Sequence, residues 1–171
     1  MILSLASLAI AAPAMAEKIG LADPADAKPS PSDVRRMTVD HGANELFVKV
    51  RFTDLRRNSE AGPSGIAIFI DTSSAIPGPE YRLGSGLQAG SDYQLVRMKD
   101  GKPVGAPLIC DHRVRLDFGR DLLKFRAART CLKSPDELRV GAKMTDLYDG
   151  SHPITDWLRQ PRSYTKFLAA G

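Results

Sequence analysis

The chain has 171 residues, of which 43% are apolar and 26% charged, with a formal net charge of +4 and 2 cysteines. This composition suits one globular domain and excludes collagen-like, coiled-coil and disordered chains. After Ala16 no stretch approaches the roughly 18 apolar residues of a membrane-spanning helix, so we expect no transmembrane segment. The 14 glycines and 12 prolines favour short elements joined by turns.

The start of the chain has the pattern of an export signal. Residues 1–16 carry no charged side chain and are mostly apolar, and they end in alanine, methionine and alanine directly before Glu17. An apolar run that ends in an A-x-A sequence is typical of a signal peptide. We therefore predict a signal peptide cleaved after Ala16, and a secreted or extracellular protein.

The residues that follow predict a surface lead-in and then a series of strands. Residues 17–32 are rich in alanine, proline and aspartate and show no periodicity, which indicates an extended lead-in. Alternating apolar and polar residues predict strands over 34–39 and 45–54, whereas 66–70 is apolar on both faces and indicates a strand near the middle of a sheet. Shorter strands are predicted over 81–83, 92–98, 104–109, 114–117, 123–127 and 138–144, and the tail offers a further candidate stretch at 164–168.

Two local signals refine this pattern. The pair Asp100-Gly101 fits a type I′ turn, which predicts a hairpin between the strands at 92–98 and 104–109. Residues 128–135 include one predicted helical turn, and no amphipathic helix of three turns is expected anywhere. Together the elements predict one all-β domain over residues 33–171, an antiparallel β-sandwich of jelly-roll type with eight or nine strands.

The cysteines are interpreted through the predicted export. Cys110 and Cys131 form an even pair in a chain expected in an oxidising compartment, which predicts a disulfide. A pair of free buried thiols is the alternative. Metal binding is less supported, because the chain has no C-x-x-C and His112 lacks partners at ligand spacing.

Several stretches together carry a resemblance: Ser32 to Val39, Val48 to Leu55, and Phe69 to Thr72 leading into Pro77 to Leu83. The combination resembles small secreted bacterial β-sandwich proteins related to DOMON domains and family 9 carbohydrate-binding modules. The resemblance implies a jelly-roll-like sandwich that binds a sugar, or in some DOMON members a haem, on one face. The chain departs from those families in having Trp157 and four tyrosines as its only platform-forming rings and no matched methionine and histidine ligands, so we expect no cofactor.

Candidate catalytic motifs are weak in this chain. Asp71 follows the apolar strand at 66–70, as one aspartate of an aspartic protease does, but that reaction needs two such loops and only one is present. The alternative is an aspartate that accepts backbone N–H groups in the loop after a central strand. No nucleophile–histidine or metal-hydrolase order is found, so we predict that the protein is not an enzyme.

Loop aspartates raise a separate possibility. Asp23, Asp26 and Asp33, with Asp71, could converge on Ca²⁺, since hard oxygen ligands supplied by loops suit that ion. Their spacing matches no defined calcium-binding loop. The sequence alone therefore assigns no metal site.

The basic residues fall on outward positions of the predicted strands. They are Arg35, Arg36, Lys49, Arg51, Arg56, Arg57, Lys124, Arg126, Arg139 and Lys143. Such positions are commonly solvated faces that also prevent edge pairing. Their functional interpretation is attraction to an anionic cell-envelope polymer or polysaccharide. Nucleic acid is not an expected partner, because the protein is predicted to be exported and few aromatic residues lie among the basic ones.

The functional hypothesis is therefore a secreted, non-catalytic binding module for carbohydrate or a cell-envelope polymer. The alternative is a structural or protein-interaction component of the envelope without a small-molecule site. Rim loops near a rigid strand suit recognition, and the side chains there that suit sugars are Asp71, Tyr81, Arg82, Tyr93 and Trp157.

Overall fold

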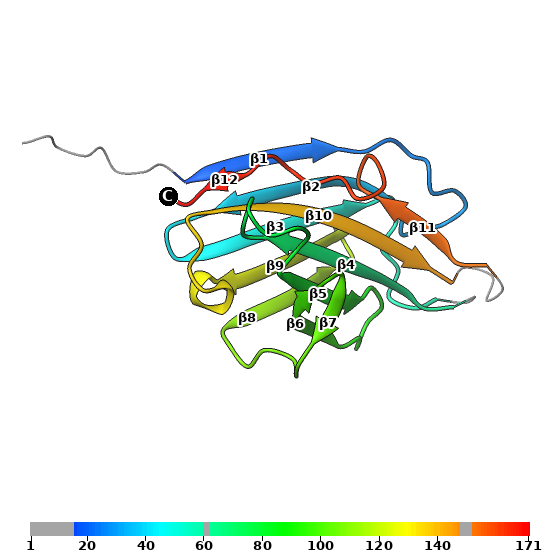
Figure 1. The fold of residues 1–171 in the computed structure, drawn as a ribbon. Coiled ribbons are helices and arrows are strands. Elements are labelled where there is room, and N and C mark those ends of the chain that lie inside the picture. The colour runs from blue at the N-terminus through cyan, green and yellow to red at the C-terminus, as the bar shows by residue number, and fades with distance from the viewer. Residues whose placement is uncertain (1–15, 60–61, 148–151) are drawn as a thin grey trace, which may run out of the picture.

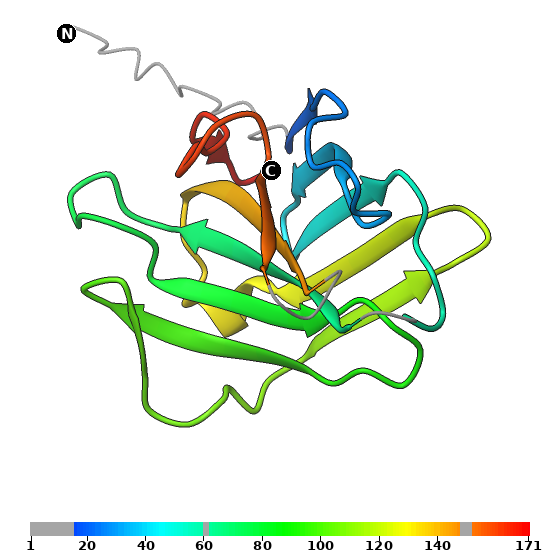
Figure 2. The same cartoon turned by 90° about the vertical axis from the view of Figure 1, so that its right-hand side faces the viewer.

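A computed structural model describes residues 16–59, 62–147 and 152–171 of the chain. The predicted signal peptide lies outside the described residues, apart from Ala16. The described residues form two antiparallel sheets that face each other, with β1 to β3, β8 and β9 in one layer and the remaining strands in the other (Figures 1 and 2). The predicted all-β antiparallel sandwich is therefore confirmed.

The five-stranded sheet has the order β1-β2-β3-β9-β8. Its strands are β1 (Glu17–Ala22), β2 (Val34–His41), β3 (Glu45–Phe52), β9 (Leu122–Ala128) and β8 (His112–Asp117). The alternation predicted for residues 45–54 is seen in β3, where Leu46, Val48 and Val50 are fully buried and the residues between them face outward. The three interior strands, β2, β3 and β9, are each paired on both sides.

The second sheet has the order β11-β10-β4-β5-β6-β7, with β12 also paired to β10. Its strands are β11 (Ile154–Trp157), β10 (Glu137–Asp146), β4 (Ser64–Asp71), β5 (Tyr81–Gly86), β6 (Tyr93–Lys99), β7 (Lys102–Val104) and β12 (Leu168–Ala169). The apolar run at 66–70 lies in β4, between β10 and β5, as predicted. The one helical segment is η1 (Arg129–Leu132), within the predicted stretch 128–135.

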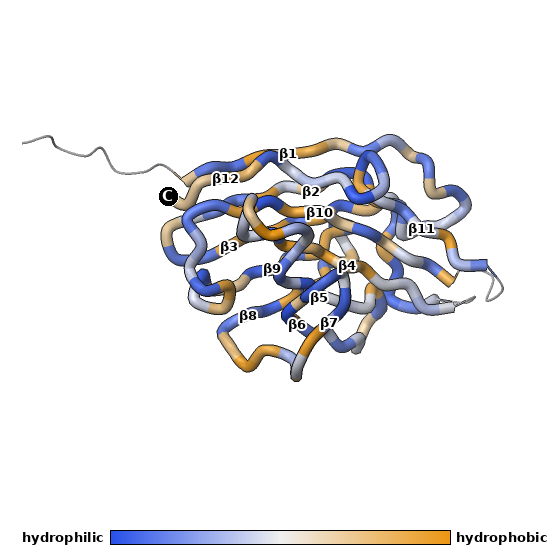
Figure 3. Tube along the Cα trace, viewed as in Figure 1, coloured by the Kyte–Doolittle hydropathy of each residue, from blue (hydrophilic) through white to orange (hydrophobic). Residues whose placement is uncertain are grey.

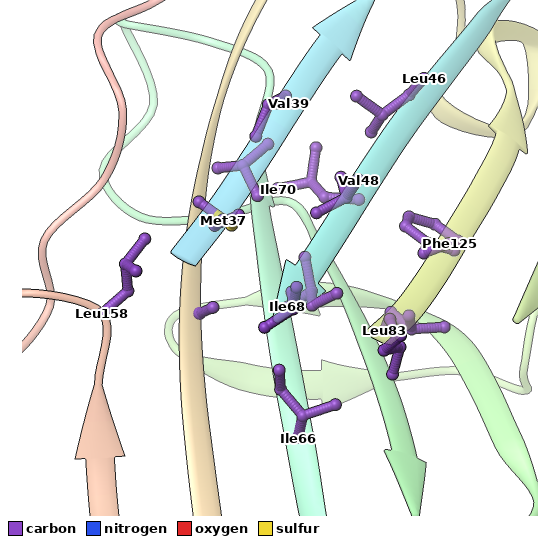
Figure 4. Close-up of a cluster of buried hydrophobic side chains, with 14 of the residues drawn as sticks. Met37, Val39, Leu46, Val48, Ile66, Ile68, Ile70, Leu83, Phe125 and Leu158 are labelled. Atoms are coloured by element: carbon purple, nitrogen blue, oxygen red, sulfur yellow. The ribbon is translucent and has the colours of Figure 1, made fainter. Parts of the chain in front are cut away.

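The core fills the space between the two sheets. Apolar and polar residues alternate along the strands (Figure 3), so each strand turns one face inward. The inward side chains of both sheets meet in a single cluster (Figure 4), whose labelled members are Met37, Val39, Leu46, Val48, Ile66, Ile68, Ile70, Leu83, Phe125 and Leu158. Inward positions are thus occupied by packing, which leaves the two outer faces and the loops for recognition.

The disulfide is present as predicted. Cys110 and Cys131 are bonded, with their Cα atoms 5.7 Å apart, and Cys131 belongs to the core. His112 Nδ1 lies 2.9 Å from the carbonyl oxygen of Cys110. Because both sulfurs are in the bond, neither thiol is available as a nucleophile or a metal ligand.

The strand count differs from the expectation. The described residues contain twelve strands rather than eight or nine, and the additional ones are short strands in the predicted lead-in and tail. β1 pairs along its length with β2, although its sequence offers only two apolar residues at strand spacing. The hairpin turn at Asp100 and Gly101 has positive φ at both residues, as a type I′ turn requires. The strand that follows it ends at Val104, so most of the strand predicted over 104–109 is wrong.

In the described residues, no helix has both the length and the apolar character that crossing a membrane would demand.

Candidate functional site: a basic groove on the five-stranded sheet

The outer face of the five-stranded sheet carries a groove of about 580 Å³. All five strands contribute side chains to it. Six of these are cationic, Lys18, Lys49, Arg113, Arg115, Lys124 and Arg126, and one is acidic, Asp40. We refer to this surface as the basic groove.

Strand register explains how residues far apart in the sequence meet there. Side chains that face the same way on adjacent strands lie opposite one another, with Cβ atoms about 4.5–5.5 Å apart. One row across the sheet consists of Gly20, Thr38, Lys49, Lys124 and Arg115. The neighbouring row consists of Lys18, Asp40, Phe47, Arg126 and Arg113.

The charges of the basic groove are only partly balanced. Lys18 Nζ lies 3.5 Å from Asp40, Lys124 Nζ lies 3.0 Å from Asp117, and Arg126 bridges Glu45 and Asp111. Within the described part of the chain, three cations have no carboxylate within ion-pair distance: Lys49, Arg113 and Arg115. All three are exposed. They are therefore free to bind an anion from outside the protein.

Protection of sheet edges does not account for this charge. Lysine and arginine on an edge strand prevent pairing with another chain, and that explanation suits β1 and β8, the two outermost strands of the sheet. Lys49 lies on β3 and Lys124 on β9, which are interior strands. Like charges directly opposite each other in a sheet are destabilising, so the facing pair Lys49 and Lys124 weakens the fold where no edge needs protection.

An aromatic ring lies among these cations. Phe47 is 40% exposed, and it is opposite Asp40 on one side and Arg126 on the other. A flat apolar ring surrounded by charged groups offers contact to the C–H face of a sugar while its neighbours bind charged substituents. Sequence reasoning did not single out Phe47, although its outward position in the alternation of β3 was the available signal.

Two more arginines extend the positive face beyond the basic groove. Arg36 on β2 lies opposite Arg51 on β3. A Cβ atom at Gly20 would approach the Arg36 guanidinium to 2.7 Å, so this glycine makes room for the arginine to lie over β1. Arg51 donates to the carbonyl of Arg120 at 3.1 Å.

The other predicted outward cations lie elsewhere. Arg35 pairs with Asp33, and Arg56 and Arg57 belong to the loop after β3. Arg139 and Lys143 lie on β10, in the second sheet. The predicted outward positions are thus confirmed for Arg36, Lys49, Arg51, Lys124 and Arg126 on the five-stranded sheet, and for Arg139 and Lys143 on β10 of the second sheet.

Asp71, the aspartate after the central strand, is fully buried and already satisfied. Its Oδ2 accepts hydrogen bonds from Arg139 Nε at 2.8 Å and Nη2 at 2.7 Å, and its Oδ1 accepts from the Ser73 backbone N–H at 3.2 Å. This is the loop-bonding role that was the alternative to a catalytic one. Asp71 therefore offers no free acceptor to a sugar hydroxyl.

The aromatic residues predicted to bind a ligand do not share one surface. Tyr81 is 4% exposed and belongs to the core, because its position in β5 faces inward. Tyr93 lies at the rim beside His112, with ring centroids 5.8 Å apart. Trp157 stacks on Phe69 on the outer face of the second sheet, with ring centroids 5.5 Å apart. Arg82 lies opposite Phe69 on the same face.

The structure thus brings together only Arg82 and Trp157 of the five predicted ligand-binding residues. Tyr81 is corrected to a core residue, since it is almost fully buried, although it also borders a pocket formed with Glu80 and Arg97. Of the four aspartates considered as calcium ligands, Asp23 and Asp26 lie close together, whereas Asp33 and Asp71 each have protein partners of their own. The basic groove on the opposite sheet carries three exposed cations without an acidic partner among the described residues, and it is our candidate site.

We compared the chain with models of protein families, with curated proteins and with solved structures, and found no match in any of the three. The resemblance to DOMON domains and family 9 carbohydrate-binding modules therefore stays a prediction. A β-sandwich by itself supports many unrelated functions. The function must accordingly be inferred from the chemistry of the basic groove.

Proposed function

We propose that this protein is a secreted, non-catalytic binding module that holds an anionic polysaccharide or cell-envelope polymer in the basic groove. The observation that carries this proposal is the row formed by Lys49, Lys124 and Arg115, in which three cations stand side by side and only Lys124 has an acidic partner. The cations of the row repel one another in the free protein. A polyanion that lies across the row offsets this repulsion, and the relief favours binding.

The side chains of the basic groove suit a charged sugar polymer. Arg113 and Arg115 are exposed guanidinium groups, which present paired N–H donors that match carboxylate, phosphate or sulfate oxygens. Phe47 adds an apolar platform in the next row. The groove is open and crosses all five strands, a shape that accepts a length of polymer rather than a small enclosed molecule.

The predicted export supports the same class of ligand, because a protein outside the cytoplasm meets envelope polymers there. The resemblance to sugar-binding sandwich modules agrees with this location. The proposed site differs from the binding surface of those modules, because it depends on charge more than on an aromatic platform.

The decisive experiment measures binding to dextran sulfate, polygalacturonate, uncharged dextran and duplex DNA by isothermal titration calorimetry at two salt concentrations. We expect binding to a sulfated or carboxylated polysaccharide that weakens at high salt, and no binding to uncharged dextran. Equal or tighter binding of duplex DNA would overturn the assignment to polysaccharide. Lack of binding to every polyanion would favour the alternative of an envelope interaction protein.

A charge-matched pair of variants tests the site itself. The double variant Lys49→Gln/Arg115→Gln removes two unpaired cations of the groove, whereas Arg97→Gln/Lys102→Gln removes an exposed arginine and lysine of the second sheet. Both lower the net charge by the same amount. We expect a loss of affinity of at least about tenfold for the groove variant and little change for the control. Equal losses would show that binding follows net charge and not this groove.

Tryptophan fluorescence separates the two outer faces. The chain has 1 tryptophan, and Trp157 lies on β11 in the second sheet, away from the basic groove. A polymer bound in the groove should therefore leave the emission of Trp157 unchanged. A saturable shift in emission would instead place the ligand on the face that carries Trp157 and Arg82.

A further inference from the structure

Three aspartates from distant parts of the chain meet at one edge of the sandwich. Asp23 directly follows β1, Asp26 lies three residues later, and Asp156 lies in β11. One carboxylate oxygen from each residue lies within 4.8 Å of the other two. Because β1 and β11 are the outermost strands of their respective sheets, this cluster spans the two layers (Figure 1).

Backbone hydrogen bonds hold the two buried carboxylates in place. Asp156 Oδ2 accepts from the Val34 N–H at 2.7 Å, and Asp23 Oδ1 accepts from the Arg159 N–H. Asp23 is only 5% exposed, yet its Oδ2 has no hydrogen-bond partner among the described residues. A buried carboxylate oxygen without a partner is costly, so this position calls for a group that the described residues do not supply.

The neighbouring cation does not supply that group. Arg35 Nη1 lies 3.3 Å from Asp33 Oδ2, and Asp33 also accepts hydrogen bonds from the Ala27 N–H and the Thr53 hydroxyl. Asp33 and Arg35 thus satisfy each other beside the cluster. Asp23, Asp26 and Asp156 are left as three carboxylates without a cationic side chain paired to them in the described part of the chain.

The proton affinity of the cluster agrees with this excess of negative charge. Burial, with a smaller contribution from the nearby carboxylates of Asp23, Asp33 and Asp26, raises the pKa of Asp156 to about 6, although the hydrogen bond from the Val34 N–H opposes the rise. Burial likewise raises the pKa of Asp23. A proton or a metal ion relieves the same repulsion.

We propose that Asp23, Asp26 and Asp156 bind one calcium ion. Three carboxylate oxygens are hard ligands of the kind that Ca²⁺ prefers, whereas Zn²⁺ sites are built mainly from nitrogen and sulfur. Oxygens on opposite sides of one calcium ion are about 4.6–5.2 Å apart, which accommodates the spacing of up to 4.8 Å seen here. The exposed position of Asp26 leaves the remaining coordination positions to water.

Such an ion would fasten the two layers together. It would join the segment after β1 to β11, so the outermost strands of both sheets would be held at the same edge. This proposal does not rest on polymer binding, because the basic groove is formed by outward side chains of the strands and not by these aspartates.

The test uses the purified protein after treatment with a chelator. Calcium chloride at millimolar concentration should give a saturable heat of binding and raise Tm by at least about 5 °C, because a ligand that binds only the folded state stabilises it. Magnesium at the same concentration should raise Tm less, since Mg²⁺ demands a stricter octahedral geometry. Terbium should give sensitised luminescence, because Trp157 is adjacent to Asp156. If calcium gave no heat of binding and no change in Tm, the proposal would be overturned.

Two aspartate variants and a control locate the site. Asp26→Asn changes an exposed residue and should leave the calcium-free fold intact while weakening calcium binding at least about tenfold. Asp100→Asn removes an exposed carboxylate from the β6–β7 turn, at a positive φ that asparagine adopts readily, and should bind calcium like the parent protein. Equal affinity of the two variants would contradict the assignment. Asp156→Asn should lose the calcium response and have a calcium-free Tm no lower than that of the parent.

Discussion

Lys49 lies directly opposite Lys124 across the paired strands β3 and β9, and Arg115 follows in the same row on β8. Asp117 reaches Lys124 but not Lys49, which has no ion pair within the described residues. Two cations at cross-strand distance repel each other, and in a sheet interior that repulsion lowers the free energy of unfolding. The basic groove therefore represents a local conflict between stability and a surface suited to anions.

The variant Lys49→Gln tests this conflict in the absence of any ligand. Removing the charge should raise the free energy of unfolding by about 0.5 kcal/mol at low ionic strength, because it relieves the repulsion with Lys124. Salt screens exposed charges, so the gain should shrink at about 1 M NaCl. Urea denaturation at both salt concentrations measures the effect, and Lys102→Gln on β7 serves as the control. A loss of stability at low salt would contradict the account.

Local sequence pattern was sufficient to predict most of the fold. The strict alternation in β3 reflects a strand with one buried face, and the apolar run in β4 reflects a strand covered on both faces. Both signals are contained within a few residues of sequence. The same approach missed β1 and β11, which are short outermost strands with only one or two inward apolar residues each. Pairing with β2 and β10 stabilises those segments, and that pairing is not encoded locally.

The candidate sites depend on relationships that a single sequence does not reveal. Outward positions for Lys49 and Lys124 follow from alternation, but their adjacency follows from the pairing of β3 with β9, which are separated by about half the chain. Likewise, Asp23 and Asp26 were noticed as loop aspartates, whereas their partner Asp156 comes from a strand near the C-terminus. Sequence reasoning proposed Asp33 and Asp71 in its place, and both are bound to arginine side chains.

Tyr81 and Trp157 should now respond differently to truncation. Tyr81 is a core residue, so Tyr81→Ala should lower the free energy of unfolding by about 3 kcal/mol through the cavity that it leaves. Trp157 is half-buried and stacks on Phe69, so Trp157→Ala should cost about 1 kcal/mol. Guanidinium denaturation of both variants measures the difference. Similar small losses in the two variants would show that Tyr81 does not carry core packing.

The disulfide should contribute substantially to stability. Cys110 and Cys131 are 21 residues apart, and their bond restricts the unfolded chain as well as joining the segment before β8 to η1. Cys110→Ala/Cys131→Ala should therefore lower the free energy of unfolding by about 3 kcal/mol. Thermal denaturation of the variant and of the reduced parent protein should give similar decreases in Tm. Alkylation and mass measurement of protein from its native source should find no free thiol.

His41 connects the fold to pH. Its side chain is fully buried, and its Nδ1 lies 2.9 Å from the carbonyl oxygen of Leu168, which can only accept a hydrogen bond. Nδ1 therefore carries the proton, and the buried Nε2 has no partner among the described residues. Burial lowers the pKa of His41 below its ordinary value of 6.5, and Arg129 lowers it further. Protonation of Nε2 would place a charged donor where the described part of the chain offers no acceptor.

Acid should therefore destabilise the fold through His41. Because the pKa of His41 is lower in the folded state, the unfolded chain binds the proton first as the pH falls. The contribution of His41 to the free energy of unfolding is complete above about pH 6.5 and declines as the pH falls through that value. His41→Gln keeps an N–H donor for the Leu168 carbonyl but does not titrate. Urea denaturation between about pH 8 and pH 5 should show a smaller decline for this variant than for the parent, and equal declines in the two proteins would show that His41 does not cause the acid sensitivity.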